Sequence, residues 1–234
     1  MSARTVDLNC DLGEGCAFDA ELMPLITSAN IACGFHAGDA LTSWTALEQA
    51  ARHGVRAGAH PGFADREHFG RRDLQVPQGQ LFAECVYQAG ALAGLARAAG
   101  IPLTHLKPHG ALYNLACRDD HYANPMVRAA QMFGLALWGL PGSLLEKRSA
   151  GACPFVAEGF ADRRYLPDGS LVPRSRPDAF VGDPAEAARQ IDRLVAERGV
   201  RTICVHGDNP QALAFVRTLR GELERLGIGI KALA

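Results

Sequence analysis

Short apolar runs alternate along this sequence with longer segments of helical spacing, and this alternation limits the folds open to the chain. The runs are too short for helices and several contain β-branched residues, so we predict that they are strands. The weakest of them, Leu135–Leu140, also suits a buried helical turn. The predicted strands are Val6–Cys10, Asn30–Phe35, Val55–Ala59, Leu103–Lys107, Leu135–Leu140, Pro154–Ala157, Thr202–Val205 and Gly229–Leu233.

The segments between these runs carry recognisable helix boundaries. The clearest helix has Asp183 as its cap, Pro184 at its first position, Glu186 three residues after the cap, and Gly199 after its end. Another helix begins in the same way at Asn209-Pro210 and ends at Gly227. The remaining predicted helices are Asp39–His53, Gln80–Ala99, Glu21–Ser28, Pro125–Met132 and Ser143–Lys147.

Seven or eight repeats of strand and helix predict parallel strands with helices as crossovers, an α/β fold. A closed β/α barrel and an open doubly wound sheet both satisfy this pattern. No linker, internal repeat or low-complexity tract divides the chain, so we expect a single domain over residues 1–234. The connections 61–76 and 161–182 are long for simple crossovers, and loops of that length are usually functional.

Composition argues against several classes of protein. Hydrophobic residues make up 48% of the chain and charged residues 21%, as in a globular protein. A net charge of −1 without a Lys/Arg cluster argues against a nucleic-acid or membrane partner. There is neither a signal-peptide apolar region nor the stretch of about 20 apolar residues that a membrane helix needs. Seven scattered cysteines without a C-x-x-C pair fit a reducing compartment, so we expect a cytoplasmic protein.

Polar residues follow the predicted strands at their carboxyl ends. Four of the eight histidines follow four different strands, and these are His36, His60, His109 and His206. Carboxylates follow the first, second, sixth and seventh strands, at Asp11, Glu14, Asp39, Glu158, Asp162 and Asp208. The carboxyl ends of parallel strands meet at one edge, where α/β proteins build active sites, so we expect a functional site there.

Side chains alternate along a strand, so residues 7, 9 and 11 share one face and residues 105, 107 and 109 share another. Asp7 and His105 lie deeper in their strands, and we expect them in a hydrogen-bonded polar layer inside the barrel. The polar side chains nearer the mouth, Asp11, Lys107 and His109, are expected to be functional.

The convergence of carboxylates and imidazoles leaves two chemistries open. The group could bind a divalent metal, or it could perform acid–base catalysis without one. No H-x-x-x-H or H-E-x-x-H motif occurs, so a metal site would have to be assembled from separate strands. Neither of the glycine-rich nucleotide-binding motifs G-x-x-x-x-G-K-[ST] and G-x-G-x-x-G occurs in the sequence. Arg71-Arg72 either clamps a carboxylate or is simply solvated.

Six segments, taken in order, resemble the LamB/YcsF family. They are DLNCDLGEG (7–15), SANIACGFHAGD (28–39), GAHPGFADREHFGRR (58–72), HLKPHGALYN (105–114), EGFADRRYLPDGSLVPR (158–174) and CVHGD (204–208). The resemblance implies a deformed seven-stranded β/α barrel related to the polysaccharide deacetylase fold. It also implies ATP-dependent hydrolysis of 5-oxo-L-proline to L-glutamate. The ATP would be consumed by a complex with 5-oxoprolinase subunits B and C (PxpB and PxpC).

The resemblance and the strand-end positions together suggest roles for individual residues. Asp11 or His109 would act as the base, and Lys107 and His36 would stabilise developing negative charge. Related deacetylases suggest Asp11, His60 and His109 as candidate ligands of a divalent metal. The expected catalytic residues are Asp11, His36, Asp39, His60, Lys107, His109, Glu158, Asp162, His206 and Asp208. The expected substrate-binding residues are Asn9, Glu14, Arg72 and Arg163.

Two alternatives to an ATP-dependent lactam hydrolase remain open from the sequence. One is a stand-alone, metal-dependent amide or acetyl hydrolase of the deacetylase type. The other is a non-catalytic component that captures a small lactam for its partners. The sequence also leaves open whether the chain forms a homo-oligomer.

Overall fold

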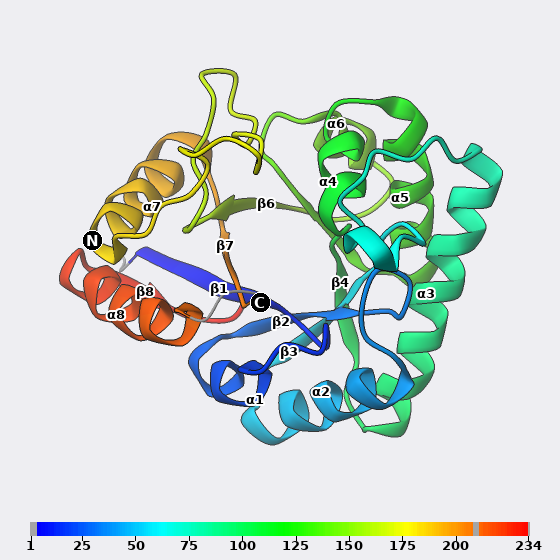
Figure 1. Ribbon diagram of the computed structural model, residues 1–234, viewed down its shortest axis with the longest axis horizontal. Helices are drawn as coiled ribbons and strands as arrows, with labels where there is room; N and C mark the ends of the chain where they lie inside the picture. Colours follow the sequence, from blue (N-terminus) through cyan, green and yellow to red (C-terminus); the bar gives the residue numbers. More distant parts are fainter. Residues whose placement is uncertain (1–3, 208–210, 234) are drawn as a thin grey trace.

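A computed structural model describes residues 4–207 and 211–233, in which helices surround a barrel of parallel strands (Figure 1). The strands are β1 (Arg4–Leu12), β2 (Ser28–Ala32), β3 (Arg56–His60), β4 (Leu103–Leu106), β5 (Ala136–Gly139), β6 (Phe155–Phe160), β7 (Thr202–His206) and β8 (Ile228–Ile230). The helices are α1 (Asp19–Leu22), α2 (Ala40–His53), α3 (Gln78–Ala98), α4 (Gly110–Ala116), α5 (Asp120–Phe133), α6 (Leu144–Ser149), α7 (Pro184–Arg198) and α8 (Ala212–Arg225). Two 3₁₀ turns are η1 (Met23–Leu25) and η2 (Arg66–His68).

The barrel closes because β1 pairs with strands from both ends of the chain. Cys10 of β1 lies opposite Ala29 of β2 and opposite Val205 of β7, and both pairings are parallel. Strands β1 to β7 therefore form a closed ring, which confirms the barrel and excludes the open sheet. Strand β8 pairs with Arg4–Val6, at the beginning of β1, and lies outside the ring. The run Leu135–Leu140 contains a strand, β5, and not a helical turn.

Capping residues explain where the clearest helices begin and end. The Asp183 carboxylate accepts hydrogen bonds from the amides of Ala185 and Glu186, at 3.1 and 3.2 Å, and so starts α7. Gly199 ends α7 in the left-handed conformation, at φ 64°. The expected start of α8 at Asn209-Pro210 lies outside the described residues. The rest of that helix is confirmed.

Two local predictions differ from the structure. Helix α4, which follows His109, was not predicted, because its residues are buried on nearly every side and show no apolar stripe. The predicted helix Glu21–Ser28 is shorter: α1 gives way to η1, and Ser28 already belongs to β2. The Thr27 hydroxyl donates to Asp7 at 2.8 Å, which holds this segment against the barrel.

The inside of the barrel is polar, while the outward faces of the strands pack under the helices. Leu8, Cys10 and Leu12 of β1 belong to the apolar core, whereas Asp7 faces inward. The Asp7 carboxylate accepts from the hydroxyls of Ser28 and Thr202, at 2.6 and 2.5 Å. Burial raises the pKa of Asp7, although these hydroxyls oppose the rise. Asp7 thus forms part of the predicted polar layer.

His105 also belongs to this layer, as predicted. Its ring stacks on Trp138 with 3.5 Å between centroids, and its Nε2 lies 2.8 Å from the carbonyl oxygen of the Asn30 side chain. A Cβ at Gly58 would stand 2.1 Å from the His105 ring, so only glycine leaves room for it. His105 therefore fills the barrel and does not reach the mouth.

Both long connections contribute to the carboxyl end of the barrel. Within 161–182, Arg163 pairs with Phe180 and Tyr165 pairs with Leu171 in antiparallel bridges, which fold the segment back on itself. It is the yellow-green excursion near the top of Figure 1. Among the described residues, no helix is both long enough and apolar enough to span a membrane.

Candidate active site at the barrel mouth

Lys107 lies at the centre of the polar interior, where it contacts three neighbouring strands. Its Nζ donates to Asp11 Oδ1 at 2.9 Å and to Cys204 Sγ at 3.0 Å, and it lies 2.9 Å from Glu158 Oε1. Burial lowers the pKa of Lys107, but the charges of Asp11 and Glu158 outweigh it and hold the pKa well above its usual value. Lys107 is therefore a fixed ammonium at the base of the site.

Asp11 lies directly above this ammonium, at the end of β1. Its Oδ1 also accepts from the Asn30 side chain at 2.8 Å, and its Oδ2 lies 3.3 Å from His60 Nε2. Burial would raise the pKa of Asp11, yet His60 and Lys107 together hold it well below the ordinary range. Asp11 is thus a buried carboxylate that stays ionised at neutral pH, and it lines the cavity at the mouth.

Three histidines pack together beside Asp11. The rings of His36 and His109 stack in parallel with 3.8 Å between centroids, and the His60 ring meets both edge-on. His60 Nε2 and His109 Nδ1 are 3.0 Å apart. Burial lowers the pKa values of His36 and His109 well below 6.5, and the nearby imidazoles lower them further. Both rings are therefore neutral at pH 7.

The Glu14 side chain reaches into the same cluster from the loop after β1. Its Oε1 lies 3.4 Å from His109 Nδ1 and 3.5 Å from His36 Nε2. Glu14, His36, His60 and His109 each offer one ligand atom, and these atoms all lie within 4.8 Å of one another. Imidazole and carboxylate are common ligands of divalent metals, so the donor set fits such an ion.

A second group with metal-ligating atoms consists of Asp11, Cys204 and His206. Here Lys107 donates to both Asp11 and Cys204, so a positive charge already occupies the space between them. Burial, followed by the charge of Asp11, raises the pKa of the Cys204 thiol well above 9. A protonated thiol beside an ammonium is a poor metal site.

His206 and Asp162 form a hydrogen-bonded pair on the opposite side of the mouth. His206 Nδ1 lies 2.9 Å from Asp162 Oδ2. Burial raises the pKa of Asp162, but the His206 charge outweighs it and the pKa is lowered. The His206 ring also stacks on Phe160, at 5.6 Å between centroids. The pair has the arrangement of an acid–base histidine oriented by a carboxylate.

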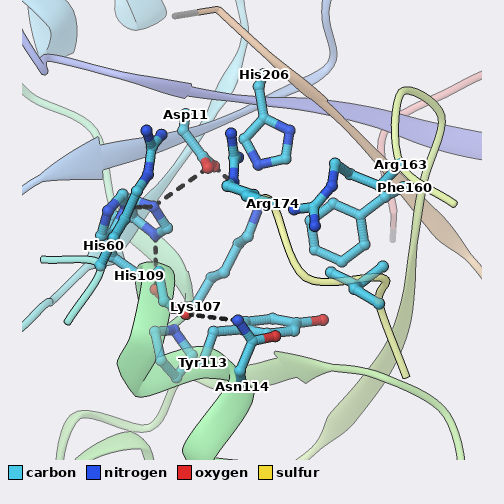
Figure 2. A pocket seen from close by; sticks show the side chains of 14 residues that line it. Asp11, His60, Lys107, His109, Tyr113, Asn114, Phe160, Arg163, Arg174 and His206 are labelled. Atoms are coloured by element: carbon cyan, nitrogen blue, oxygen red, sulfur yellow. Dashed lines mark hydrogen bonds and ion pairs between the residues drawn. The ribbon is translucent and has the colours of Figure 1, made fainter. Parts of the chain in front are cut away.

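Three arginines from the long loops line the cavity above Asp11 and Lys107. The cavity is small, with a volume of about 40 Å³, and Arg71, Arg163 and Arg174 lie on its wall. In Figure 2, His60 and His109 stand on one side of Asp11, while Arg163 and Phe160 stand on the other. Burial, followed by the charge of Arg174, lowers the pKa of Arg163 to about 10, so it remains a cation at neutral pH. The cavity therefore suits a small anion.

Most of the predicted site residues meet at this mouth, but four of the described ones do not. Asp39 is exposed and caps α2, accepting from the Thr42 amide at 2.8 Å, so its predicted catalytic role is not supported. The Arg72 guanidinium is held by Asp65 at 2.7 Å and does not line the cavity. Asn9 is fully buried below Lys107, where it donates to Glu158 and Thr202, so it lies out of reach of a substrate.

The remaining predicted residues divide into three places. Glu158 is buried with Lys107 in the interior and does not stand at the rim. Asp208 lies outside the described residues. The predicted residues that the structure brings together around the mouth are Asp11, Glu14, His36, His60, Lys107, His109, Asp162, Arg163 and His206.

Sequence reasoning missed several residues that line the cavity. Arg174 arrives from the far end of a long loop, so no local pattern pointed to it. Tyr113 and Asn114 come from the unpredicted helix α4. Arg71-Arg72 was named as a possible carboxylate clamp, and of the two residues only Arg71 lines the cavity.

Comparisons of the sequence and of the fold with known proteins identify relatives of this chain. The sequence profile of the LamB/YcsF family matches residues 6–234. A Geobacillus thermodenitrificans protein, named as the A subunit of 5-oxoprolinase, is 44% identical over 98% of this chain and 97% of its own length. A lactam utilization protein from Thermus thermophilus covers 98% of this chain and 100% of its own, with TM-score 0.89 and 41% identity. A Bacillus cereus polysaccharide deacetylase shares the fold, with TM-score 0.54 and 18% identity over 99% of this chain and 92% of its own.

Proposed function

Because this chain belongs to the LamB/YcsF family, we propose that it opens the lactam ring of 5-oxo-L-proline as one component of an ATP-dependent 5-oxoprolinase complex. Support comes from the relative named as a 5-oxoprolinase component, which matches almost the whole chain. The observation that carries the proposal is the small cavity in which three arginines face an ionised carboxylate and neutral histidines.

The cationic wall of the cavity suits the carboxylate of 5-oxoproline. Arg163 is buried, and its Nη2 donates to the Val172 carbonyl at 2.6 Å, so its guanidinium is held in place beside the cavity. Arginine can bind a carboxylate with two parallel hydrogen bonds, which fixes its orientation. Arg163, assisted by Arg174, would therefore hold the substrate carboxylate and direct the ring toward Asp11.

Hydrolysis of the lactam needs activation, because the amide is resonance-stabilised. Transfer of the ATP γ-phosphoryl to the amide oxygen would make the ring carbon electrophilic. A water molecule then adds to that carbon, the C–N bond breaks, and the nitrogen takes up a proton. The resulting acyl phosphate reacts with a second water to give glutamate and phosphate.

The side chains at the mouth match these steps. Asp11 is ionised and lines the cavity, so it can accept the proton of the attacking water. General-base catalysis contributes about 10²–10⁴ in rate. The Lys107 ammonium below it offsets the negative charge that develops on oxygen. His206, oriented by Asp162, is positioned to exchange a proton with the departing nitrogen.

A divalent metal, held by the histidine cluster when bound, would act as a Lewis acid toward an oxygen of the substrate. ATP is assigned to the complex, because no glycine-rich nucleotide loop occurs in this sequence. Subunits B and C (PxpB and PxpC) are the proposed partners, and the complex is proposed to act in the cytoplasm. The relative is named as one lettered subunit of an enzyme, which supports an assembly with other subunits.

The test is glutamate release from 5-oxoproline, with and without ATP. The tagged chain is assayed alone and after co-purification from its native lysate, with partner subunits identified by mass spectrometry. Strictly ATP-dependent glutamate in the co-purified sample alone is the expected result. Asp39→Ser serves as the control variant, because serine also caps helices and Asp39 lies away from the cavity. No glutamate from a sample that contains both partners would refute the substrate assignment.

One alternative is favoured by a specific observation. The Glu14 and histidine group could hold a metal, as a stand-alone amide or acetyl hydrolase would require. Metal-dependent release of acetate from N-acetyl sugars by the lone chain would support that alternative. A third outcome, tight 5-oxoproline binding with complex activity unchanged after replacement of all four mouth histidines, would indicate a non-catalytic binding component.

A further inference from the structure

The hydrogen bonds of His60 and His109 determine which nitrogen of each ring carries a proton. His60 Nδ1 lies 2.8 Å from the Lys107 carbonyl oxygen, and His109 Nε2 lies 2.8 Å from the Phe69 carbonyl oxygen. A carbonyl oxygen only accepts, so both of these nitrogens must carry hydrogen. In the neutral rings, His60 Nε2 and His109 Nδ1 are therefore left with bare lone pairs.

These two lone pairs point at each other across 3.0 Å. Two bare lone pairs at this distance repel each other, so the contact is favourable only if a proton or a metal ion lies between the two nitrogens. A bound metal ion satisfies both nitrogens at once. Metal-ligating histidines usually donate their other N–H to a carbonyl or carboxylate, as both of these rings do.

Glu14 and His36 complete the set of donors. Neither ring nitrogen of His36 has a hydrogen-bond partner among the residues that the structure describes, although the ring is buried. An unpaired buried polar atom is destabilising, so an orphaned imidazole indicates a missing partner. The Glu14 carboxylate oxygen faces His36 Nε2 and supplies the negative charge that a cation requires.

Three of the six distances between these donor atoms are close to those around a tetrahedral ion. Ligand bonds of about 2.0–2.1 Å at tetrahedral angles place neighbouring donor atoms about 3.3 Å apart. The three measured edges are 3.0 Å (His60–His109), 3.4 Å (His109–Glu14) and 3.5 Å (His36–Glu14). We propose that Glu14, His36, His60 and His109 bind one divalent transition-metal ion, for which Zn²⁺ is the best match to three imidazoles and one carboxylate.

Two glycines of the 61–76 connection hold the rings in this arrangement. A Cβ at Gly62 would stand 2.6 Å from His36 Nδ1, and a Cβ at Gly70 would stand 2.8 Å from His36 Cβ. Gly70 also has φ +64°, which side chains rarely adopt. The backbone thus packs closely against the His36 ring from the loop side.

This site differs from the Asp11, His60 and His109 set that deacetylases suggest. Asp11 contacts His60 at 3.3 Å, but its Oδ1 is bound by Lys107 and Asn30, and it is not among the four mutually close donors. Asp11 therefore remains available as a base beside the ion. The assignment rests on ligand geometry and holds whatever substrate the chain takes.

The test measures metal binding and does not depend on activity. The tag-free chain is purified without chelator and its metal content is determined by mass spectrometry. It is then stripped and titrated with Zn²⁺ by calorimetry. We expect about one Zn²⁺ per chain and, after substitution with Co²⁺, the intense visible absorption of a four-coordinate ion. Removing a residue that hydrogen-bonds to a metal ligand lowers metal affinity about 10–100-fold. Removing a ligand itself should cost more, so we expect His36→Ala and Glu14→Gln each to lower Zn²⁺ affinity at least about 100-fold.

His206→Ala and Asp11→Asn are the matched controls, because they alter the second group of donors and leave the proposed set intact. Both should keep full Zn²⁺ stoichiometry, and far-UV circular dichroism checks that every variant is folded. Zn²⁺ binding that survives in folded His36→Ala but is lost in His206→Ala would place the metal at the other group and overturn the proposal. Absence of Zn²⁺ binding by the wild-type chain would overturn it as well, and neither result depends on glutamate release.

Discussion

Replacing Lys107 by methionine tests the electrostatic design of the barrel interior. Methionine has a similar length but no charge, so the variant leaves Asp11 and Glu158 without the ammonium that lies 2.9 Å from each. Breaking a buried ion pair by removing one partner costs about 3–5 kcal/mol. Asp11 keeps its contacts with Asn30 and His60, so we expect a loss near the lower end of that range, about 3 kcal/mol at pH 7.

The loss should shrink as the pH falls. Burial already raises the pKa of Glu158, and without Lys107 the pKa of Asp11 rises too. The folded variant then binds protons that the unfolded chain releases, so its stability improves relative to wild type between pH 7 and pH 5. The double variant Lys107→Met/Glu158→Gln should recover about 1–2 kcal/mol of the lost stability, because it removes one of the two unpaired carboxylates.

Urea denaturation followed by tryptophan fluorescence measures these differences. Trp138 stacks on His105 within the barrel and reports directly on its interior. The reasoning fails if Lys107→Met unfolds within about 1 kcal/mol of wild type at pH 7. An equal loss of stability at pH 7 and pH 5, and in the double variant, would also refute the electrostatic explanation.

Three further variants probe the helix cap, the barrel interior and an isolated carboxylate. Asp39→Ala removes the cap of α2, so calorimetry should show a Tm lower by about 2–4 °C. Glutamate release should be unchanged, and a large loss of turnover would show that Asp39 takes part in the site. Gly58→Ala forces a Cβ to 2.1 Å from the His105 ring, and urea denaturation should show a loss of at least about 2 kcal/mol; a neutral effect would mean that the ring can move. Burial raises the pKa of Asp19 to about 6, so the folded state holds a proton that the unfolded state has lost between pH 4 and 6. Stability should therefore fall across that interval and stay level above it. The decline should be about 1–2 kcal/mol after allowance for the partial exposure of Asp19, and Asp19→Asn should abolish it. An identical decline in the variant would assign the effect to another group.

The order of strands and helices could be predicted because each strand is a short apolar run that ends in glycine or polar residues. Closure of the barrel could not be derived from periodicity, since it depends on Cys10 pairing with both Ala29 and Val205, contacts between distant parts of the chain. The resemblance to the LamB/YcsF family did indicate the barrel. Helix α4 escaped prediction because burial on nearly every side erases the apolar stripe.

The mouth residues could be predicted because parallel strands bring their carboxyl ends together. The predicted residues that lie away from the cavity belong to residue types that serve more than one purpose. An aspartate after a strand can cap the next helix as readily as it can join a site, and Asp39 caps α2. Arg71 and Arg72 are adjacent, yet Arg71 reaches the cavity and Arg72 pairs with Asp65. Arg174 depends on how a long loop folds, which no local pattern records.

We propose that the lactam ring opens at this barrel mouth, with Asp11 as the base. The most direct test is ATP-dependent glutamate release by the co-purified complex that carries Asp11→Asn, compared with the complex that carries Asp39→Ser. We expect at least about 100-fold slower release with Asp11→Asn, near-normal release with Asp39→Ser, and intact assembly in both. Near-wild-type glutamate release by an assembled Asp11→Asn complex would contradict the account.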